Sequence, residues 1–167
     1  MITARSTAGR VWVLLAAVAV IGCNRSAGSE PVLPQLRVMT AAELRAVPLT
    51  AALDLPVQMS VYAWRDFMPT AGDTTRKHDL MLSAQLRGGV VPPKALSCTG
   101  IYLVLADSVY AARPAEQRAG DGPGAVECLL RGGPEWPVGA DIHVIISIGA
   151  GAQRALIRRE TTIDATS

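Results

Sequence analysis

The strongest strand signal in the chain is IHVIISI, residues 142–148, where isoleucine and valine fill most positions. β-Branched side chains favour extended backbone, so this stretch predicts a strand. The letters GAG follow at residues 149–151 and are a hairpin signal. Residues 153–159 are expected to pair back on this strand, and residues 161–163 to extend the second arm. The C-terminal part of the chain therefore predicts an antiparallel pair of strands.

Strand patterns also occur on the N-terminal side of this hairpin. Residues 57–64 and 80–87 alternate apolar and polar side chains with a period of two, as in a strand with one buried face. Residues 99–105 are apolar on both faces, which is typical of a central strand. Residues 109–112 are expected to continue that strand after a bend near Asp107.

Two further segments lie between residue 112 and the hairpin in the sequence. Residues 114–124 are polar and rich in glycine, so we expect a loop there. Residues 126–130 are mostly apolar and predict another short strand.

Together these segments predict an all-β domain, residues 53–165, with six or seven short strands. Their number and spacing resemble an immunoglobulin-like or fibronectin-like antiparallel β-sandwich over residues 55–163. An eight-stranded up-and-down barrel would need more strands. No tryptophan lies between Cys98 and Cys128, so the chain departs from the antibody-domain pattern.

The N-terminus has the layout of an export signal. Arg5 and Arg10 precede an unbroken apolar run at residues 11–21, and Gly22 stands directly before Cys23. A positive start, a short apolar run and a small-residue stop are typical of a secretory signal peptide. Eleven apolar residues are fewer than the roughly 20 that a spanning helix needs. Secretion without lipid and a retained anchor remain the alternatives.

The cysteine at the cut point resembles the signal of bacterial lipoproteins. That resemblance implies removal of residues 1–22 and attachment of long acyl chains, palmitate among them, at Cys23. Asn24, rather than aspartate, follows the cysteine, which implies sorting to the outer membrane. The expected location is therefore the cell envelope, with the protein held on a membrane by its lipid anchor.

Residues 23–52 are expected to form a tether between this anchor and the β domain, because serine, glycine and proline recur there. Within it, the segment from Thr40 to Glu43 matches a helix capping box. Pro48 would end that helix after about two turns. Once residues 1–22 are removed, 145 residues remain, enough for one domain with a tether.

Charge and cysteine usage narrow the functional classes. Removing Arg5 and Arg10 with the signal leaves equal numbers of basic and acidic residues, so nothing indicates nucleic-acid binding. With Cys23 used by the lipid, Cys98 and Cys128 remain as one possible pair. An oxidising compartment favours a structural disulfide. A redox pair or a metal thiolate is the alternative, although no CxxC spacing or nearby histidine supports it.

No catalytic set is predicted. His78 and His143 are the only histidines, and no serine sits in a nucleophile-elbow motif. Copper would require a spaced set of histidine, methionine and cysteine ligands, which is missing. Asp121 alone offers too few oxygens for calcium. The sequence therefore predicts no metal, no cofactor and no enzymatic activity.

Trp64 and Trp136 are the candidate binding residues, because tryptophan dominates many binding hot spots. The alternative is that both plug the open ends of the sandwich. We therefore expect a non-catalytic, lipid-anchored envelope protein whose β domain is a binding or structural module. Its partner would be another envelope protein or a cell-wall polymer. An inhibitor or accessory subunit of an exported enzyme, presenting residues 113–124, is the alternative.

Overall fold

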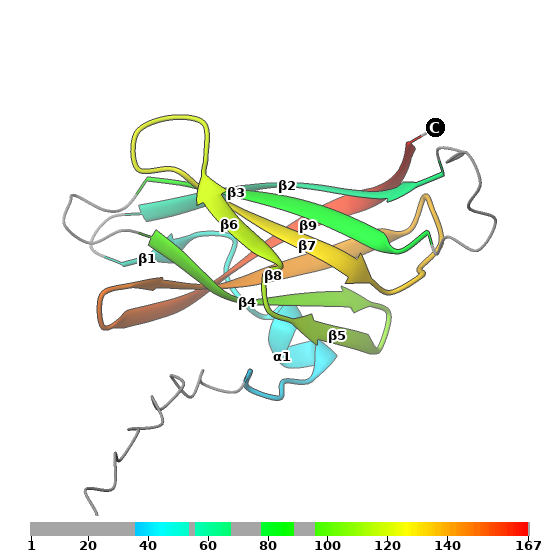
Figure 1. The fold of residues 1–167 in the computed structure, drawn as a ribbon. Coiled ribbons are helices and arrows are strands. Elements are labelled where there is room, and N and C mark those ends of the chain that lie inside the picture. The colour runs from blue at the N-terminus through cyan, green and yellow to red at the C-terminus, as the bar shows by residue number, and fades with distance from the viewer. Residues whose placement is uncertain (1–35, 54–55, 68–77, 89–95, 167) are drawn as a thin grey trace, which may run out of the picture. The chain divides into compact units, whose positions relative to one another are not determined.

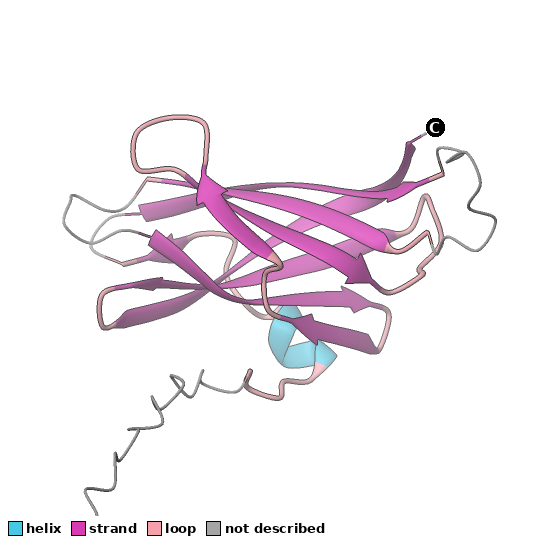
Figure 2. Cartoon of the chain, in the orientation of Figure 1, coloured by secondary structure: helices cyan, strands magenta, loops and turns pink. Residues whose placement is uncertain are grey.

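A computed structural model of the protein describes residues 36–53, 56–67, 78–88 and 96–166. These residues form one short helix and nine strands, and Figure 2 shows that strands dominate. In chain order the elements are α1 (Ala41–Arg45), β1 (Ala51–Ala52), β2 (Pro56–Asp66), β3 (Leu80–Arg87), β4 (Leu96–Leu105), β5 (Ser108–Ala112), β6 (Glu116–Ala119), β7 (Val126–Gly133), β8 (Asp141–Ala150) and β9 (Gln153–Thr166).

The strands follow one continuous path, with β5 and β6 at its two ends. Neighbours along this path are β5-β4-β8-β9-β2-β3-β7-β6, and β1 pairs with β2 outside it. β9 joins the two halves of the path. It pairs antiparallel with β8 from Gln153 to Thr162, and parallel with β2 from Ile163 to Thr166. The other strand pairs are antiparallel, so the sheet is mixed.

This path is curled, so that its two halves face each other across one core (Figure 1). We call β5, β4, β8 and the first part of β9 the β4 layer. We call β2, β3, β7, β6 and the end of β9 the β3 layer. The core is almost entirely aliphatic and includes fully buried residues from both layers: Val57, Leu82, Leu86, Ile101, Leu103, Ile146, Ile148, Ile157 and Ile163.

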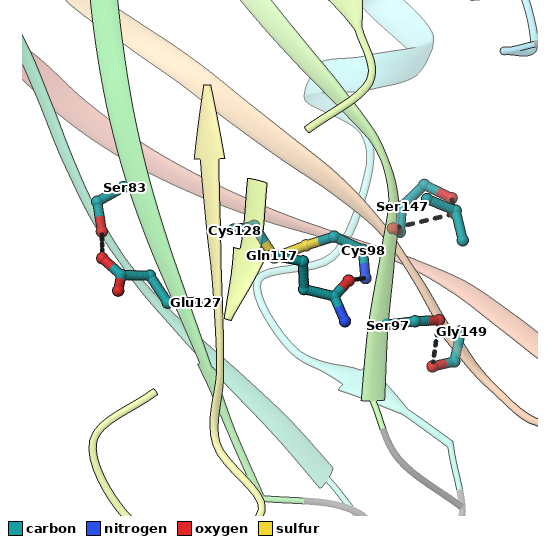
Figure 3. The surroundings of a disulfide bond; sticks show 9 residues. Ser83, Ser97, Cys98, Gln117, Glu127, Cys128, Ser147 and Gly149 are labelled. Atoms are coloured by element: carbon teal, nitrogen blue, oxygen red, sulfur yellow. Dashed lines mark hydrogen bonds between the residues drawn. A yellow bond between two sulfur atoms is a disulfide. The ribbon is translucent and has the colours of Figure 1, made fainter. Parts of the chain in front are cut away.

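A disulfide links the two layers. Cys98 on β4 and Cys128 on β7 are bonded, with their Cα atoms 6.2 Å apart. These strands are not neighbours in the sheet, so the bond crosses the core (Figure 3). Beside it, Gln117 Oε1 accepts a hydrogen bond of 2.7 Å from the Cys98 amide. The predicted pairing of Cys98 with Cys128 is confirmed.

The prediction of an all-β fold is also confirmed, whereas the strand count of six or seven is too low. One missed strand is β6, which lies inside the expected loop 114–124. All four of its residues are exposed, so it shows no alternation of apolar and polar residues. Another is β1, which is only two residues long.

The expected continuation of residues 99–105 into 109–112 is wrong. β5 turns back and pairs antiparallel with β4, from Ile101↔Ala112 to Leu105↔Ser108. Ala106 makes this reversal with a positive φ of 46°, a conformation that residues other than glycine seldom adopt. Asp107, a typical turn residue, signals the expected bend, but no local pattern shows that the chain reverses to pair with β4.

The described part of the expected tether, from Leu36 onward, belongs to the packed domain. The capping box is confirmed, because Thr40 Oγ1 accepts from the Glu43 amide and Glu43 Oε2 accepts from the Thr40 amide. Leu44 is fully buried in a second cluster on the outer face of the β4 layer. The serines and glycine that indicated a tether, and all its prolines but Pro48, lie at residues 26–34, outside the described residues, whereas apolar burial stabilises the described part.

Hydrogen bonds hold the same segment in place. Arg158 on β9 donates from Nε to the Val47 carbonyl and from its amide to the Pro48 carbonyl, both at 3.0 Å. Gly100 allows the close approach of Leu36, because a Cβ at that position would lie 2.4 Å from Leu36 Cδ2. The predicted signal at residues 1–22 and the predicted lipidation site Cys23 lie outside the described residues.

Candidate functional site

Trp64 lies on the outer face of the β3 layer, together with Tyr62. β2 alternates there, with Ala63 fully buried in the core between these two outward residues. The Tyr62 and Trp64 rings stack, with centroids 5.2 Å apart and planes at 19°. Tyr62 is 46% exposed and Trp64 is half-buried. An amphipathic aromatic pair is therefore presented on an open sheet surface.

The neighbouring strands complete a shallow pocket beside this pair. Met81 on β3 is opposite Trp64, and Ser83 is opposite Tyr62. The pocket has a volume of about 160 Å³. Its lining residues come from β2, β3, β6 and β7, and they are Trp64, Met81, Ser83, Arg118, Glu127, Leu129, Leu130 and Arg131. We call the outward residues of these four strands the open face.

Glu127 is the buried charge of the open face. Only 11% of its side chain is exposed. Arg118 donates from Nε to Glu127 Oε2 at 2.6 Å, and the Ser83 hydroxyl donates to Oε1 at 2.5 Å. Figure 3 shows the Ser83–Glu127 pair on one side of β7 and the disulfide on the other. The alternation of β7 thus sends Glu127 to the open face and Cys128 to the core.

These contacts keep Glu127 ionised. The hydrogen bond from Arg118, followed by that from Ser83, holds the pKa of the Glu127 carboxyl below its usual value. The same pair raises the pKa of Arg118. A carboxylate with a lowered pKa is a weak general base at neutral pH. The Ser83 hydroxyl is therefore positioned by Glu127 more than it is activated by it.

Other polar side chains extend the network along the face. Gln85 donates from Nε2 to Asp121 at 3.3 Å and accepts at Oε1 from Arg87 at 3.1 Å. Farther along β7, Arg131 Nη2 lies 3.8 Å from Glu116 Oε2. The open face thus combines one aromatic pair with linked hydrogen-bonding groups.

Trp136 lies in different surroundings from Trp64. It is half-buried and packs against the main core. Its carbonyl accepts a hydrogen bond of 3.1 Å from Arg65 Nη1. The packing role weighed for both tryptophans in the sequence fits Trp136, while Trp64 joins the pocket. The two candidate binding residues are therefore not brought together in one site.

The histidines also lie apart from the pocket. His143 on β8 contacts Arg158 Nη1 at 3.1 Å and Glu160 Oε1 at 3.3 Å. His78, before β3, stacks on Phe67, and its Nδ1 lies 2.6 Å from the Asp66 carbonyl oxygen. Among the residues that the structure describes, no three His, Cys, Asp or Glu side chains gather closely enough to hold a metal ion.

Sequence reasoning missed Ser83, Arg118 and Glu127 as one group. The available signal was Glu127, which is the only charged residue of the otherwise apolar segment 126–130. A charge inside an apolar strand needs a partner, because burying it alone is costly. The partner came from β6, a strand that had been expected to be a loop.

Comparison with known proteins found no matching family model, no similar curated protein and no similar solved structure. Within the described part of the chain, no helix is long and apolar enough to cross a membrane. The function of the chain is therefore inferred from the geometry of the open face.

Proposed function

We propose that this chain is an exported, lipid-anchored envelope protein whose β domain is a non-catalytic binding module. The observation that supports the proposal best is the Tyr62–Trp64 pair. It is stacked and partly exposed on a sheet face over which Figure 1 shows no helix among the described residues. Aromatic side chains kept at a surface position of a strand offer a large apolar contact area to a partner.

The chemistry of the pocket favours binding over catalysis. Glu127 is tied to Arg118 and has a lowered pKa, which makes it a poor acceptor for a proton from Ser83. His78 and His143, the only imidazoles of the chain, contact other groups. The domain is thus suited to holding a partner without transforming it.

The two-layer arrangement supports a likeness in plan to immunoglobulin-like sandwiches, many of which act as binding domains. The parallel pairing of β2 with β9 is the point of departure. The proposed location is the cell envelope, at the outer membrane. Acyl chains on Cys23 would supply the attachment, and the partner would be a cell-wall polymer or another envelope protein.

The anchor is tested by Cys23→Ala. We expect the wild-type protein to take up metabolic acyl label and to sediment with membranes, and the variant to stay unlabelled, either as the unprocessed precursor or as a released protein. A wild-type protein without label, or a labelled variant, would contradict the lipoprotein part of the proposal.

The binding part is tested through tryptophan fluorescence. Trp64 and Trp136 are the only tryptophans after the predicted signal, so Trp136→Phe leaves Trp64 as the reporter. We expect solubilised envelope fractions or purified cell-wall material to change its emission. The same additions should leave Trp64→Phe, which retains Trp136, unchanged. An unaltered signal with every fraction would argue against a binding module.

An inhibitor or accessory subunit is the second candidate, favoured by β6. This strand ends the sheet path, and all four of its residues are exposed, so it offers an edge for pairing with another protein. Replacing residues 113–124, which include β6, by a short glycine–serine turn should then abolish association with an exported enzyme. Unchanged association would remove this alternative.

A further inference from the structure

The charges that line the pocket are already paired. Arg118 bonds Glu127 at 2.6 Å, and Arg131 lies 3.8 Å from Glu116. An anion near Arg118 or Arg131 would lie beside the carboxylate that each already contacts, and a cation would lie beside the guanidinium, so a net charge on the ligand gains little there. Complete displacement of Arg118 by a ligand would be costly, because it would leave the mostly buried carboxylate of Glu127 without its counterion. The electrostatics thus favour a ligand without formal charge.

Hydrogen-bonding groups of both kinds surround the pocket. Arg118 uses Nε on Glu127 and has further N–H donors on its guanidinium, while each carboxylate oxygen of Glu127 can accept more than one bond. Gln85 and Ser83 add an amide and a hydroxyl to the same face. A hydroxyl group donates and accepts at once, so a hydroxyl-rich ligand can use both kinds.

The size of the pocket limits what enters it. A volume of about 160 Å³ is about half of the lower limit of roughly 300 Å³ for pockets that enclose a drug-sized molecule. One ring can enter, while the rest of a longer ligand has to lie along the sheet. The stacked rings of Tyr62 and Trp64 are placed to contact the C–H face of such a ring.

A protein partner fits this face less well. Protein interfaces have an apolar centre made of several large side chains. Six described large apolar residues are exposed, and of these only Tyr62 belongs to the open face; the others are Val38, Leu49, Phe67, Val109 and Val138.

From these observations we infer that the open face binds an uncharged, hydroxyl- and amide-bearing glycan strand, with one sugar ring in the pocket beside Trp64. The inference rests on the proposed binding function and names the ligand class for the same site. The glycan backbone of a cell wall, built from N-acetylated sugars, has this chemistry.

The experiment uses the exported protein with Trp136→Phe. Trp64 emission is titrated with an N-acetylglucosamine oligosaccharide, with the polyanion polygalacturonate and with a solubilised envelope protein fraction. We expect a saturable response to the neutral oligosaccharide. Its midpoint should change less than about twofold between 50 and 500 mM salt, because salt screens charge contacts and leaves neutral ones intact.

Variants locate the response. Tyr62→Ala should weaken oligosaccharide binding about three- to tenfold, since one aromatic contact is removed. Val138→Ser, which changes an exposed apolar residue away from the open face, is the matched control and should bind as the parent does. If Trp136→Phe fails to fold, wild type and Trp64→Phe are compared instead, with the response present only in the former.

The outcomes separate the two proposals. A response to polygalacturonate alone, or to the protein fraction alone, overturns the glycan inference and leaves the binding module standing. No response to any of the three overturns both. An oligosaccharide response that Tyr62→Ala and Val138→Ser weaken equally would place the ligand elsewhere and also contradict the inference.

Discussion

The outer faces of the two layers differ in what covers them. On the β4 layer, Leu44 and Val47 cover Tyr102 and Ile145, which are 3% and 0% exposed. On the β3 layer, Tyr62 is 46% exposed although it occupies the equivalent outward position of its strand. The outer face of the β4 layer is thus buried in a second, smaller core, whereas Tyr62 on the outer face of the β3 layer is exposed.

This difference is visible in the amino-acid patterns. β4 is buried on both faces from Gly100 to Val104, as strands covered on both sides are, and β8 adds Ile145 to the same outer face. β2 alternates strictly from Val57 to Ala63, as a strand with one solvated face does. On such a strand, Tyr62 and Trp64 stand at positions where a polar residue would be expected. An aromatic residue at a solvent-facing position of an alternating strand is therefore a sequence signal for a candidate binding surface.

Removing the Cys98–Cys128 disulfide between the layers should have the largest effect on the free energy of unfolding. Replacing both Cys98 and Cys128 by alanine removes a cross-link that closes a loop of 30 residues. We expect the free energy of unfolding to fall by about 3–4 kcal/mol in the chain-entropy treatment. Denaturant titration of the variant measures this. A loss under about 1 kcal/mol would mean that the layers are held by the core alone.

Leu44→Ala tests the covered face. Leu44 is fully buried, so truncation removes apolar contact and leaves a cavity, at a cost of about 2–3 kcal/mol. Leu49→Ala is the matched control, because Leu49 is 49% exposed, and it should change stability by less than about 0.5 kcal/mol. Equal effects of the two substitutions would contradict the assignment of residues 36–48 to the domain.

Glu127→Gln tests the charge beneath the open face. We expect a loss of about 1 kcal/mol at neutral pH from weakened hydrogen bonds to Arg118 and Ser83. The pKa of Glu127 is lowered in the folded protein, so its contribution is present above the usual pKa of 4.5 and is lost as the pH falls below that value. The stability difference between wild type and variant should therefore shrink from pH 7 to pH 3.

Thermal unfolding of the two proteins side by side is the appropriate measurement. The pKa of Glu43 is also lowered, through its hydrogen bond with Thr40, so acid weakens wild type and variant alike through that group. A difference that is constant with pH would show that Glu127 and Arg118 are not paired in solution.

Tyr62→Ser should have the smallest effect on stability, about 0.5–1 kcal/mol, because the side chain is 46% exposed and loses mainly its stacking contact with Trp64. The adjacent Ala63→Leu points into the core instead and should cost about 1–3 kcal/mol through overpacking. Chemical denaturation of both variants checks the alternation of β2. A large loss from Tyr62→Ser would make the aromatic pair a packing feature and would weaken the binding proposal.

Local patterns were sufficient to predict most of the sheet. Alternation located β2 and β3, β-branched content located β8, and the glycines after it located the hairpin to β9. The pairing of Cys98 with Cys128 followed from the cysteine count. The capping box at Thr40 located α1. Each of these signals lies within a few residues or depends on residue type alone.

Long-range pairings were not predictable in this way. The parallel contact of β2 with the end of β9 joins residues about a hundred positions apart, and no local pattern encodes it. β6 was missed because an edge strand with four exposed residues lacks alternation. Without β6, the sequence placed Arg118 in a loop, and the pocket around Glu127 could not be assembled.

The docking of residues 36–48 on the β4 layer also sets how far the domain can travel from a membrane. If Cys23 is lipidated, about a dozen residues separate the anchor from Leu36, and a chain of that length extends to at most about 45 Å. A tether continuing to residue 52 would have allowed about 100 Å. The Arg158 hydrogen bonds to Val47 and Pro48 thus help to reduce the maximum length of the tether by about half. A ligand fixed farther than that from the lipid surface would be out of reach of the open face.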